Sequence, residues 1–406
     1  MEAVTLEVVA NILRAVIIFG LIFAGILAIL LWKKNQTKRL SFLRLFIQVA
    51  FVPLIFIGLI LGPFGLPAFD FLGVAPRSSL VVTDIFGAPA PDGLSVPVLA
   101  CYYPSGRSVT CPIWQIQSYI FPFWDVGGGW NVYYFTDGLI RLAVVFALVM
   151  VMSIVLGRVF CGWICPFGLY MDLLTRLRTA LKIRYRLLSE RVNNALRQSR
   201  YLIIAAFLIL SFMFGSEAIL GMQLIPGTES GGYLYNYFSA PFCQVCPMRP
   251  LSVLVESGLG FMKSSYVFSQ TTGLFYEAGY YINSLGVAVL VAVSVGSFMV
   301  RRLWCRICPL GGLISLFDRF PPFKWISGVS LCKVEEKCTK CGICKRVCPT
   351  QVTDVYEKKG GDVTAADCIM CFRCVEMCPY EGCLNINVAG KSVYKSRNWL
   401  EKPKLE

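Results

Sequence analysis

CTKCGICKRVCP, residues 338–349, sets four cysteines at a spacing that returns as CIMCFRCVEMCP at residues 368–379. Both stretches read C-x₂-C-x₂-C-x₃-C-P. Three thiolates on one tight loop can cap one face of a cubane iron–sulfur cluster, and a fourth from a distant loop closes it. The repeat therefore predicts a small domain that holds two [4Fe-4S] clusters.

In this two-cluster ferredoxin spacing, the fourth cysteine of each run ligates the other cluster. The predicted ligands are Cys338, Cys341, Cys344 and Cys378 for cluster 1, and Cys368, Cys371, Cys374 and Cys348 for cluster 2. Structural zinc also takes four cysteines, but two complete repeats, each followed by proline, favour iron–sulfur clusters. Cys332 and Cys383 lie outside the spacing and are predicted to be small buried apolar residues.

The rest of the chain is strongly apolar. Of 406 residues, 56% are hydrophobic and 15% charged, and the mean hydropathy is +0.64, which predicts a membrane protein. Five apolar stretches are long enough to cross a hydrocarbon core of about 30 Å. They are residues 13–32, 45–62, 139–157, 201–221 and 283–300. We expect the first to be retained as a span, because no Ala-x-Ala cleavage site follows it.

The distribution of Lys and Arg predicts the orientation, because basic residues collect on the cytoplasmic side of spans. They gather after the first, third and fifth stretches, whereas the loops 63–138 and 222–282 hold few. This places the amino terminus outside and everything after residue 301 in the cytoplasm. The net charge of +14 is then a topology signal, and no nucleic-acid binding is expected.

The predicted fold class is an α-helical multi-pass membrane domain with about five spans, followed by a C-terminal cytoplasmic α+β ferredoxin domain with two [4Fe-4S] clusters. The expected boundaries are 1–62 for the first two transmembrane helices, 63–138 for an extracytoplasmic loop region, 139–325 for a membrane domain with Cys-Pro motifs, 326–390 for the ferredoxin domain and 391–406 for a tail.

The chain contains no histidine and 18 cysteines. The absence of histidine excludes bis-histidine haem, Rieske ligation, histidine-containing zinc sites and histidine acid–base catalysis. No haem is therefore expected, and any redox chemistry depends mainly on sulfur.

Two related motifs, GRVFCGWICPFG at 157–168 and RRLWCRICPLGG at 301–312, follow apolar stretches at predicted cytoplasmic ends. Their cysteines can form a further, inner-face cluster site made of Cys161, Cys165, Cys305 and Cys308. The alternatives are a thiol redox role, or a plain helix end in which proline stops the helix and cysteine packs as an apolar residue.

APFCQVCPMRP, residues 240–250, falls on the predicted outer side together with part of the loop 63–138. The candidate outer group is Cys101, Cys111, Cys243 and Cys246. It can hold an outer-face cluster, but a Cys101–Cys111 disulfide, a redox-active Cys-x-x-Cys pair and a Cu(I) site remain alternatives. The aromatic residues Trp114, Phe121, Phe123, Trp124 and Trp130 are interpreted as an interfacial belt in preference to a quinone pocket.

Taken together, these motifs resemble the membrane-bound polyferredoxins grouped around the NapH and NosR proteins of nitrate and nitrous oxide respiration. The resemblance covers about residues 140–380 and includes both Cys-Pro motifs and both ferredoxin runs. It implies a protein of the prokaryotic cytoplasmic membrane that passes electrons between quinone-pool or cytoplasmic carriers and a partner reductase or dehydrogenase. The second motif departs from the family by spacing its cysteines as Cys-x-x-Cys, and the chain has no flavin-attachment motif, so flavin is not expected.

Two functions from different classes stay open. The first is a membrane-bound electron-transfer subunit of an anaerobic respiratory chain, whose partners are other redox subunits, membrane lipid and a candidate quinone. The second is a maturation factor that reduces a metal such as copper, or a thiol, during assembly of another metalloenzyme. The sequence shows no substrate site, which favours a non-catalytic subunit over an enzyme.

Overall fold

The computed structural model describes residues 39–56, 111–120, 132–214, 240–258, 284–319 and 328–398. These residues fall into two compact units. The first contains 51–56, 111–120, 132–149, 201–214, 240–258 and 284–296, and the second contains 39–50, 150–200, 297–319 and 328–398. The predicted span 13–32, Cys101 and the aromatic residues Phe121, Phe123, Trp124 and Trp130 lie outside the described residues.

The first unit is helical. It contains the short helices α5 (Pro112–Ile120), α12 (Pro241–Val245) and α13 (Met248–Gly258). The Gln117 side chain accepts a hydrogen bond from the backbone N–H of Phe242 at 2.8 Å, and the Phe242 ring meets Phe207 edge-on with centroids 5.1 Å apart. These contacts join α5 to α12 and α12 to α9.

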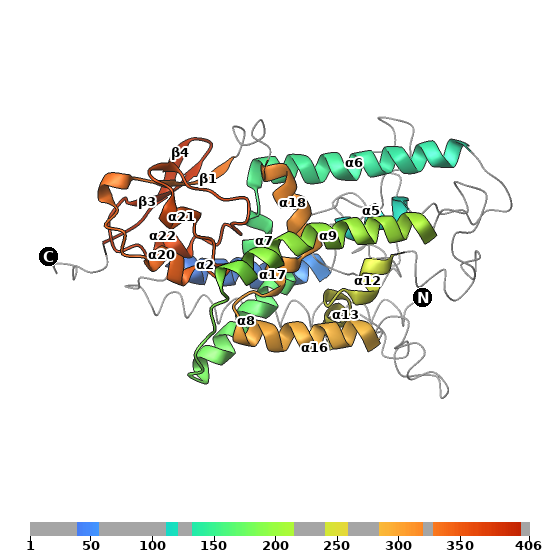
Figure 1. The fold of residues 1–406 in the computed structure, drawn as a ribbon, viewed down its shortest axis with the longest axis horizontal. Helices are drawn as coiled ribbons and strands as arrows, with labels where there is room; N and C mark the ends of the chain where they lie inside the picture. The colour runs from blue at the N-terminus through green and yellow to red at the C-terminus, as the bar shows by residue number, and fades with distance from the viewer. Residues whose placement is uncertain are drawn as a thin grey trace, which may run out of the picture. The chain divides into compact units, whose positions relative to one another are not determined.

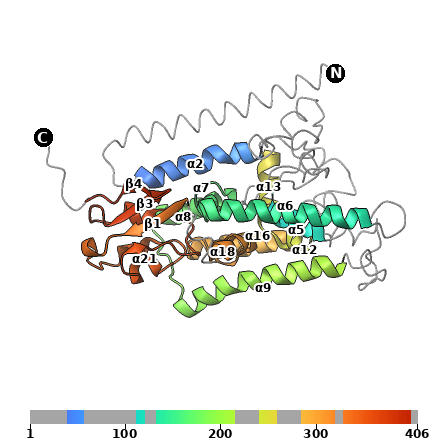
Figure 2. The ribbon, with the colours of Figure 1, turned by 90° about the horizontal axis from the view of Figure 1, so that it is seen from above.

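The longer helices are apolar in composition. They are α2 (Arg39–Phe56), α6 (Val132–Leu156), α9 (Glu190–Phe214) and α16 (Ser284–Met299). The axes of α6, α9 and α16 are nearly parallel, and α9 runs in the opposite direction to the other two (Figures 1 and 2). Val287, Val291 and Val295 form an exposed apolar stripe on α16. Such a stripe is typical of a helix that packs against lipid or another apolar surface.

Within the described part of the chain, one helix, Glu190–Met213, is long and apolar enough to cross a membrane. Three shorter apolar helices, Leu40–Phe51, Leu142–Leu156 and Leu285–Met299, overlap the stretches predicted to be spans at 45–62, 139–157 and 283–300. The number of spans and their orientation stay predictions.

In the second unit, each Cys-Pro step ends one helix and begins another. Helix α7 (Val159–Trp163) gives way to α8 (Pro166–Ala180), and α17 (Trp304–Ile307) gives way to α18 (Pro309–Arg319). The ψ angles of Cys165 and Cys308 are 119° and 121°. A residue before proline is pushed out of the helical region, so the cysteine breaks the helix and proline starts the next one at its N1 position.

The C-terminal part of the second unit is the predicted α+β domain (Figure 1). Its antiparallel sheet has the order β2-β1-β3-β4, with β1 Val329–Lys333, β2 Gly361–Asp362, β3 Leu384–Val388 and β4 Lys391–Lys395. Four helical turns accompany it: η1 Glu335–Lys337, α20 Ile343–Val347, α21 Asp354–Glu357 and α22 Arg373–Glu376.

The domain ends later than the predicted boundary at residue 390. Strand β4 pairs with β3 in the register Val388↔Lys391 and Asn385↔Lys395, so the start of the expected tail belongs to the sheet. The hydrophobic core of the domain contains Leu331, Val363 and Val375, and it also takes in Trp163 from α7. The Cys-Pro motif at 157–168 and the ferredoxin domain therefore share one core.

Candidate functional site

The ferredoxin domain contains a cavity at the predicted position of cluster 1. Its lining includes Cys338, Cys341, Cys344 and Cys378, the four cysteines predicted to be ligands of that cluster. Cys341 is exposed at this cavity. The cavity and its four thiols fit an iron–sulfur cluster held near the protein surface.

The two cysteine loops share an unusual backbone. We define the first loop as residues 338–344 and the second loop as residues 368–374. In the first loop, Lys340 and Gly342 have φ of 53° and 72°; in the second, Met370 and Phe372 have φ of 50° and 53°. A bulky residue such as Phe372 rarely adopts this left-handed conformation. Left-handed residues at matched positions turn successive N–H groups inward to form a nest, which binds anions such as the sulfides of iron–sulfur centres.

The thiols predicted for cluster 2 lie close together. Burial raises the pKa of Cys374 well above its ordinary value, and the nearby thiols of Cys368, Cys371 and Cys348 raise it further. The Cys348 Sγ accepts a hydrogen bond from the backbone N–H of Val352 at 3.3 Å. Neighbouring thiols that disfavour ionisation in this way are stabilised as thiolates when metal ions bind them.

Cys383 belongs to the predicted cluster 1 site. It is buried, as predicted, but it also lines the cluster 1 cavity. Hydrogen bonding between Cys383 and Cys378 lowers the pKa of Cys378 and raises that of Cys383. Cys383 lies five residues after Cys378 but outside the C-x₂-C-x₂-C-x₃-C-P spacing, so the motif assigns it no role.

The structure brings the four inner cysteines together. Cys305 and Cys308 are buried, and Cys161 and Cys165 are partly buried. Burial raises the pKa of Cys308, and the neighbouring thiols of Cys161, Cys305 and Cys165 raise it further. The Cys308 Sγ also accepts a hydrogen bond from the backbone N–H of Gly311 at 3.5 Å. Within the described ranges, no three Cys, Asp or Glu side chains lie close enough to bind one metal ion together. A cubane cluster has a different requirement, because each of its cysteines binds a different iron.

Two fully buried arginines cross-link the inner motifs. The Arg158 Nη2 donates to the Cys305 carbonyl at 3.2 Å, and the Arg302 Nη1 donates to the Cys161 carbonyl at 2.8 Å. Each arginine thus begins at one motif and reaches the other. Burial opposes the charge of Arg158, but the nearby Cys161, Asp367 and Cys305 raise its pKa. Two guanidinium groups therefore lie beside the inner cysteines, whose thiols become negatively charged when they ionise.

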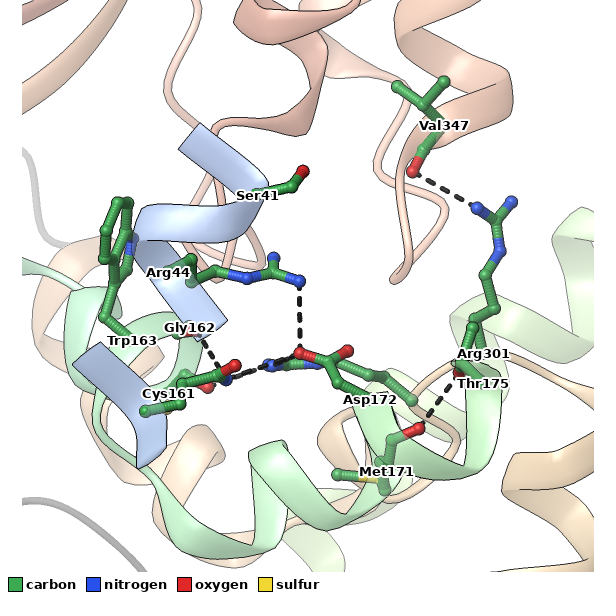
Figure 3. A network of polar contacts seen from close by, with 12 residues as sticks. Ser41, Arg44, Cys161, Gly162, Trp163, Met171, Asp172, Thr175, Arg301 and Val347 are labelled. Carbon is green, nitrogen blue, oxygen red and sulfur yellow. Dashed lines mark hydrogen bonds and ion pairs between the residues drawn. The ribbon is translucent and has the colours of Figure 1, made fainter. Parts of the chain in front are cut away.

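Asp172 holds this arrangement together (Figure 3). Its Oδ1 accepts from the Arg302 Nε at 3.0 Å, and its Oδ2 accepts from the Arg302 Nη2 at 2.6 Å and from Arg44 at 3.1 Å. The Gln48 amide donates to the Gly162 carbonyl at 3.1 Å. Burial alone would raise the pKa of Asp172, but the two guanidinium groups hold it well below its usual range. The network joins α2, α8 and the start of the second inner motif.

The sequence alone gives Asp172 no role. It is one of two acids, with Glu190, in the arginine-rich stretch 158–200. Because its partners are 128 and 130 residues away in the chain, local spacing carries no trace of the pairing.

The second loop packs directly on the first inner motif. A Cβ atom at Gly162 would lie 2.2 Å from the carbonyl oxygen of Ile369. The Trp163 Nε1 donates to the Met370 carbonyl at 2.7 Å, and Arg158 donates to the Asp367 carbonyl at 3.2 Å. This close contact places the predicted cluster 2 ligands beside the inner cysteines.

Further contacts join the second inner motif to the chain around Cys348. Arg301 donates to the carbonyls of Arg346 at 2.7 Å and Val347 at 3.4 Å, and Figure 3 shows the latter contact. Arg306 donates to the Pro349 carbonyl at 3.1 Å. Both inner motifs are thus attached to the cluster 2 side of the domain.

The first unit holds the described outer cysteines. Cys111 and Cys246 are buried, and Cys243 is partly buried. Burial raises the pKa of Cys243 to about 12, and the nearby Cys111 raises it in the same direction. The structure thus brings Cys111 and Cys243 together, while Cys101 lies outside the described residues and its disulfide or ligand role stays a prediction.

Comparison with sequence families identifies the chemistry. A family described as "4Fe-4S binding domain" matches residues 139–184 and 283–327, which contain the inner cysteines. A family described as "4Fe-4S dicluster domain" matches residues 337–382, which contain all eight cysteines of the repeat. Iron–sulfur chemistry is therefore confirmed for this chain. No solved structure matches it.

The chain is also similar to several known proteins. It is 29% identical over 236 residues to an uncharacterised protein of Methanocaldococcus jannaschii, a match that covers 57% of this chain and 73% of the other. It is 24% identical to the protein YccM of Escherichia coli, with 62% and 58% covered. It is 25% identical to the ferredoxin-type protein NapH of Haemophilus influenzae, with 57% and 63% covered.

More distant matches point the same way. They include the protein NirI of Paracoccus denitrificans, the regulatory protein NosR of Pseudomonas aeruginosa and the methylamine utilization ferredoxin-type protein MauN of Methylorubrum extorquens. The matched regions span 24% of NirI and 23% of NosR. The activities of those longer proteins therefore do not transfer directly to this chain.

Proposed function

We propose that the chain, which is similar to NapH, NosR and other 4Fe-4S proteins of the ferredoxin type, is a membrane-anchored electron-transfer subunit. Its C-terminal domain holds two [4Fe-4S] clusters and exchanges electrons with a third cluster at the inner cysteines. One observation carries this proposal: the second loop packs on the first inner motif, with Gly162 against the Ile369 carbonyl. A cluster bound in each place supplies one-electron redox chemistry.

The assignment of ligands rests on the cavity and on the loops. Cys338, Cys341, Cys344 and Cys378 hold cluster 1, and their cavity supports this set. Cys368, Cys371, Cys374 and Cys348 hold cluster 2, where the matched left-handed residues direct N–H groups inward. Backbone and Cys383 hydrogen bonds to the sulfurs favour the thiolate form and raise the reduction potential.

The third site is supported by its electrostatics. A cluster bound by four thiolates is an anionic centre, and burying one requires nearby positive charge. Arg158 and Arg302 supply that charge within hydrogen-bonding distance of the Cys305 and Cys161 backbone. Asp172 then fixes Arg302 in position by two hydrogen bonds.

The proposed location of the protein in the cell rests on the sequence. We place the chain in the prokaryotic cytoplasmic membrane as a multi-pass protein, with its amino terminus outside and its ferredoxin domain in the cytoplasm. Its partners are redox subunits such as a reductase or dehydrogenase, and quinone is a candidate carrier. No residue of the chain is assigned a catalytic role on a substrate.

A second function is favoured by the outer cysteines. Cys111 lies near Cys243. Cys111 directly precedes α5, Cys243 lies in α12, and these two helices contact each other. A dithiol or soft-metal site of this kind suits a maturation factor that reduces copper or a disulfide of another protein. A cluster at the same place suits the electron-transfer role.

Counting iron and labile sulfide in anaerobically purified protein tests the proposal. About eight irons per chain correspond to the ferredoxin domain alone, and about twelve correspond to a third cluster. We expect at least about twelve in the natural chain and about four fewer in the double variant Cys161→Ser/Cys305→Ser. The matched control, Cys332→Ser, changes a cysteine outside every predicted ligand set and should keep the full count. Eight irons in both the natural chain and the double variant would contradict a third cluster.

A further inference from the structure

The two cysteine loops differ in exposure. In the first loop, Thr339, Lys340 and Cys341 are exposed. In the second loop, Ile369, Met370, Cys371 and Phe372 are at most 9% exposed. The two loops therefore have the same cysteine spacing but differ in solvent exposure.

The second loop is covered by the inner motifs. Gly162 and Trp163 contact the Ile369 and Met370 carbonyls, and the Trp163 ring lies 6.0 Å from that of Phe372, centroid to centroid. Just beyond the second motif, Ser315 donates a hydrogen bond to the carbonyl of Ala366, which precedes the second loop, at 3.0 Å. An external protein has no access to this loop through the side that the motifs occupy.

The first loop lies within a basic surface, which we call the loop-1 face. Its exposed basic residues are Lys337, Lys340, Lys345 and Arg346. Exposed acids on the adjoining segments are Glu336, Glu357 and Glu381. No ion pair involves the four basic residues within the described ranges. The face therefore has a net positive charge around the exposed ligand Cys341.

We propose that the loop-1 face is the docking surface for a small acidic electron-carrier protein, and that electrons pass from cluster 1 to cluster 2 before reaching the inner cysteines. The inference rests on the proposed function. Complementary charge steers such a partner and raises its association rate. In the reducing direction, the carrier loses one electron and the cluster at Cys338, Cys341, Cys344 and Cys378 gains it, with no bond made or broken.

The alternative occupant of a basic face is a layer of anionic lipid headgroups. The observations favour a protein for a structural reason. The loop in contact with the inner motifs is the second one, whereas the basic residues surround the ligand that is exposed for electron exchange. Electron transfer requires close approach of two redox centres, which an exposed ligand provides.

Stopped-flow reduction of the full-length holoprotein in nanodiscs tests the inference. The variant is Lys340→Glu/Lys345→Glu, and the control is Lys391→Glu/Lys395→Glu, which makes the same charge change at exposed positions of β4 that do not line the cavity. The electron donors are a reduced acidic [4Fe-4S] ferredoxin and, as a small cation, the methyl viologen radical. At low salt we expect about a tenfold slower reduction of the variant by the ferredoxin, which fades as salt screens the charges.

The two donors separate the possible failures. Normal reduction by viologen shows that the clusters are present, so a ferredoxin rate that is equal in natural chain and variant overturns the docking inference alone. An equal loss in the β4 control also overturns it, because the effect is then one of net charge. A loss seen only in nanodiscs with anionic lipid, and absent with neutral lipid, assigns the face to headgroups and overturns it as well. Absence of iron in the natural chain overturns the proposed function itself.

Discussion

Replacing Gly162 by alanine tests the contact on which the proposed electron path depends. The added Cβ would lie 2.2 Å from the Ile369 oxygen, 3.4 Å from its carbonyl carbon and 3.5 Å from the Cys371 nitrogen. All three are backbone atoms, so no side-chain rotation relieves the clash. The second loop and α7 must separate by roughly 1 Å to restore an ordinary contact.

The cost follows from what that separation breaks. Overpacking a close contact costs roughly 1–3 kcal/mol. The hydrogen bond from Trp163 to the Met370 carbonyl, now 2.7 Å long, is stretched as well, which costs about 0.5–1.5 kcal/mol. We therefore expect the second loop to open more easily by about 2–4 kcal/mol, or roughly 30- to 700-fold in the opening equilibrium.

Amide hydrogen exchange measures this opening directly. In Gly162→Ala the amides of residues 366–374 should lose protection, while those of strands β1 and β3 should keep it. The matched control is Gly157→Ala, at a glycine with φ of 56° and nothing within 4 Å of its Cβ position, so it adds backbone strain without a clash. Equal protection in both variants would refute the reasoning.

Three further predictions concern Asp172 and the two cysteines Cys378 and Cys383 of the cluster 1 cavity. Asp172→Asn leaves two buried guanidinium groups without their carboxylate and should destabilise the second unit by about 3–5 kcal/mol, measured by thermal loss of the iron–sulfur absorbance. Asp354→Asn, which breaks an exposed pair with Lys358, should cost less than about 1 kcal/mol, and equal losses would contradict the assignment. Because the folded-state pKa of Asp172 is depressed, its stabilising effect should be complete above pH of about 4 and decline only as the pH falls towards the folded-state pKa; a loss beginning near neutrality would contradict this origin. Cys378→Ala should remove about four irons per chain, whereas Cys383→Ala should keep them and lower a reduction potential in a redox titration; an equal iron loss would make Cys383 a ligand.

The cysteine spacing was enough to predict the C-terminal domain, because ligand geometry restricts the spacing of cysteines on a tight loop. Confirmation comes from the dicluster family match at 337–382 and the four-stranded α+β domain. The spacing did not predict that Phe372 would adopt a left-handed conformation, since only Gly342 of the first loop signals one. It also did not predict β4, because a short polar hairpin strand has no distinctive apolar pattern.

The connection between the domain and the inner motifs was less predictable. The shared Cys-Pro pattern brought Cys161, Cys165, Cys305 and Cys308 into one hypothesis, and the structure does place these thiols together. The contacts that support them depend on residues far apart in sequence, such as Arg302 with Asp172. Periodicity within one sequence carries no information about such pairs, and only the folded structure shows which residues meet.

The most direct test of the electron path is the magnetic interaction between the cluster at Cys368, Cys371, Cys374 and Cys348 and the cluster at the inner cysteines. EPR spectra of the fully reduced, full-length protein report this coupling, which requires two paramagnetic clusters close together. We expect a coupled spectrum in the natural chain that simplifies in Cys161→Ser/Cys305→Ser, while the signals of the two-cluster domain remain. Identical spectra from the two proteins would contradict it.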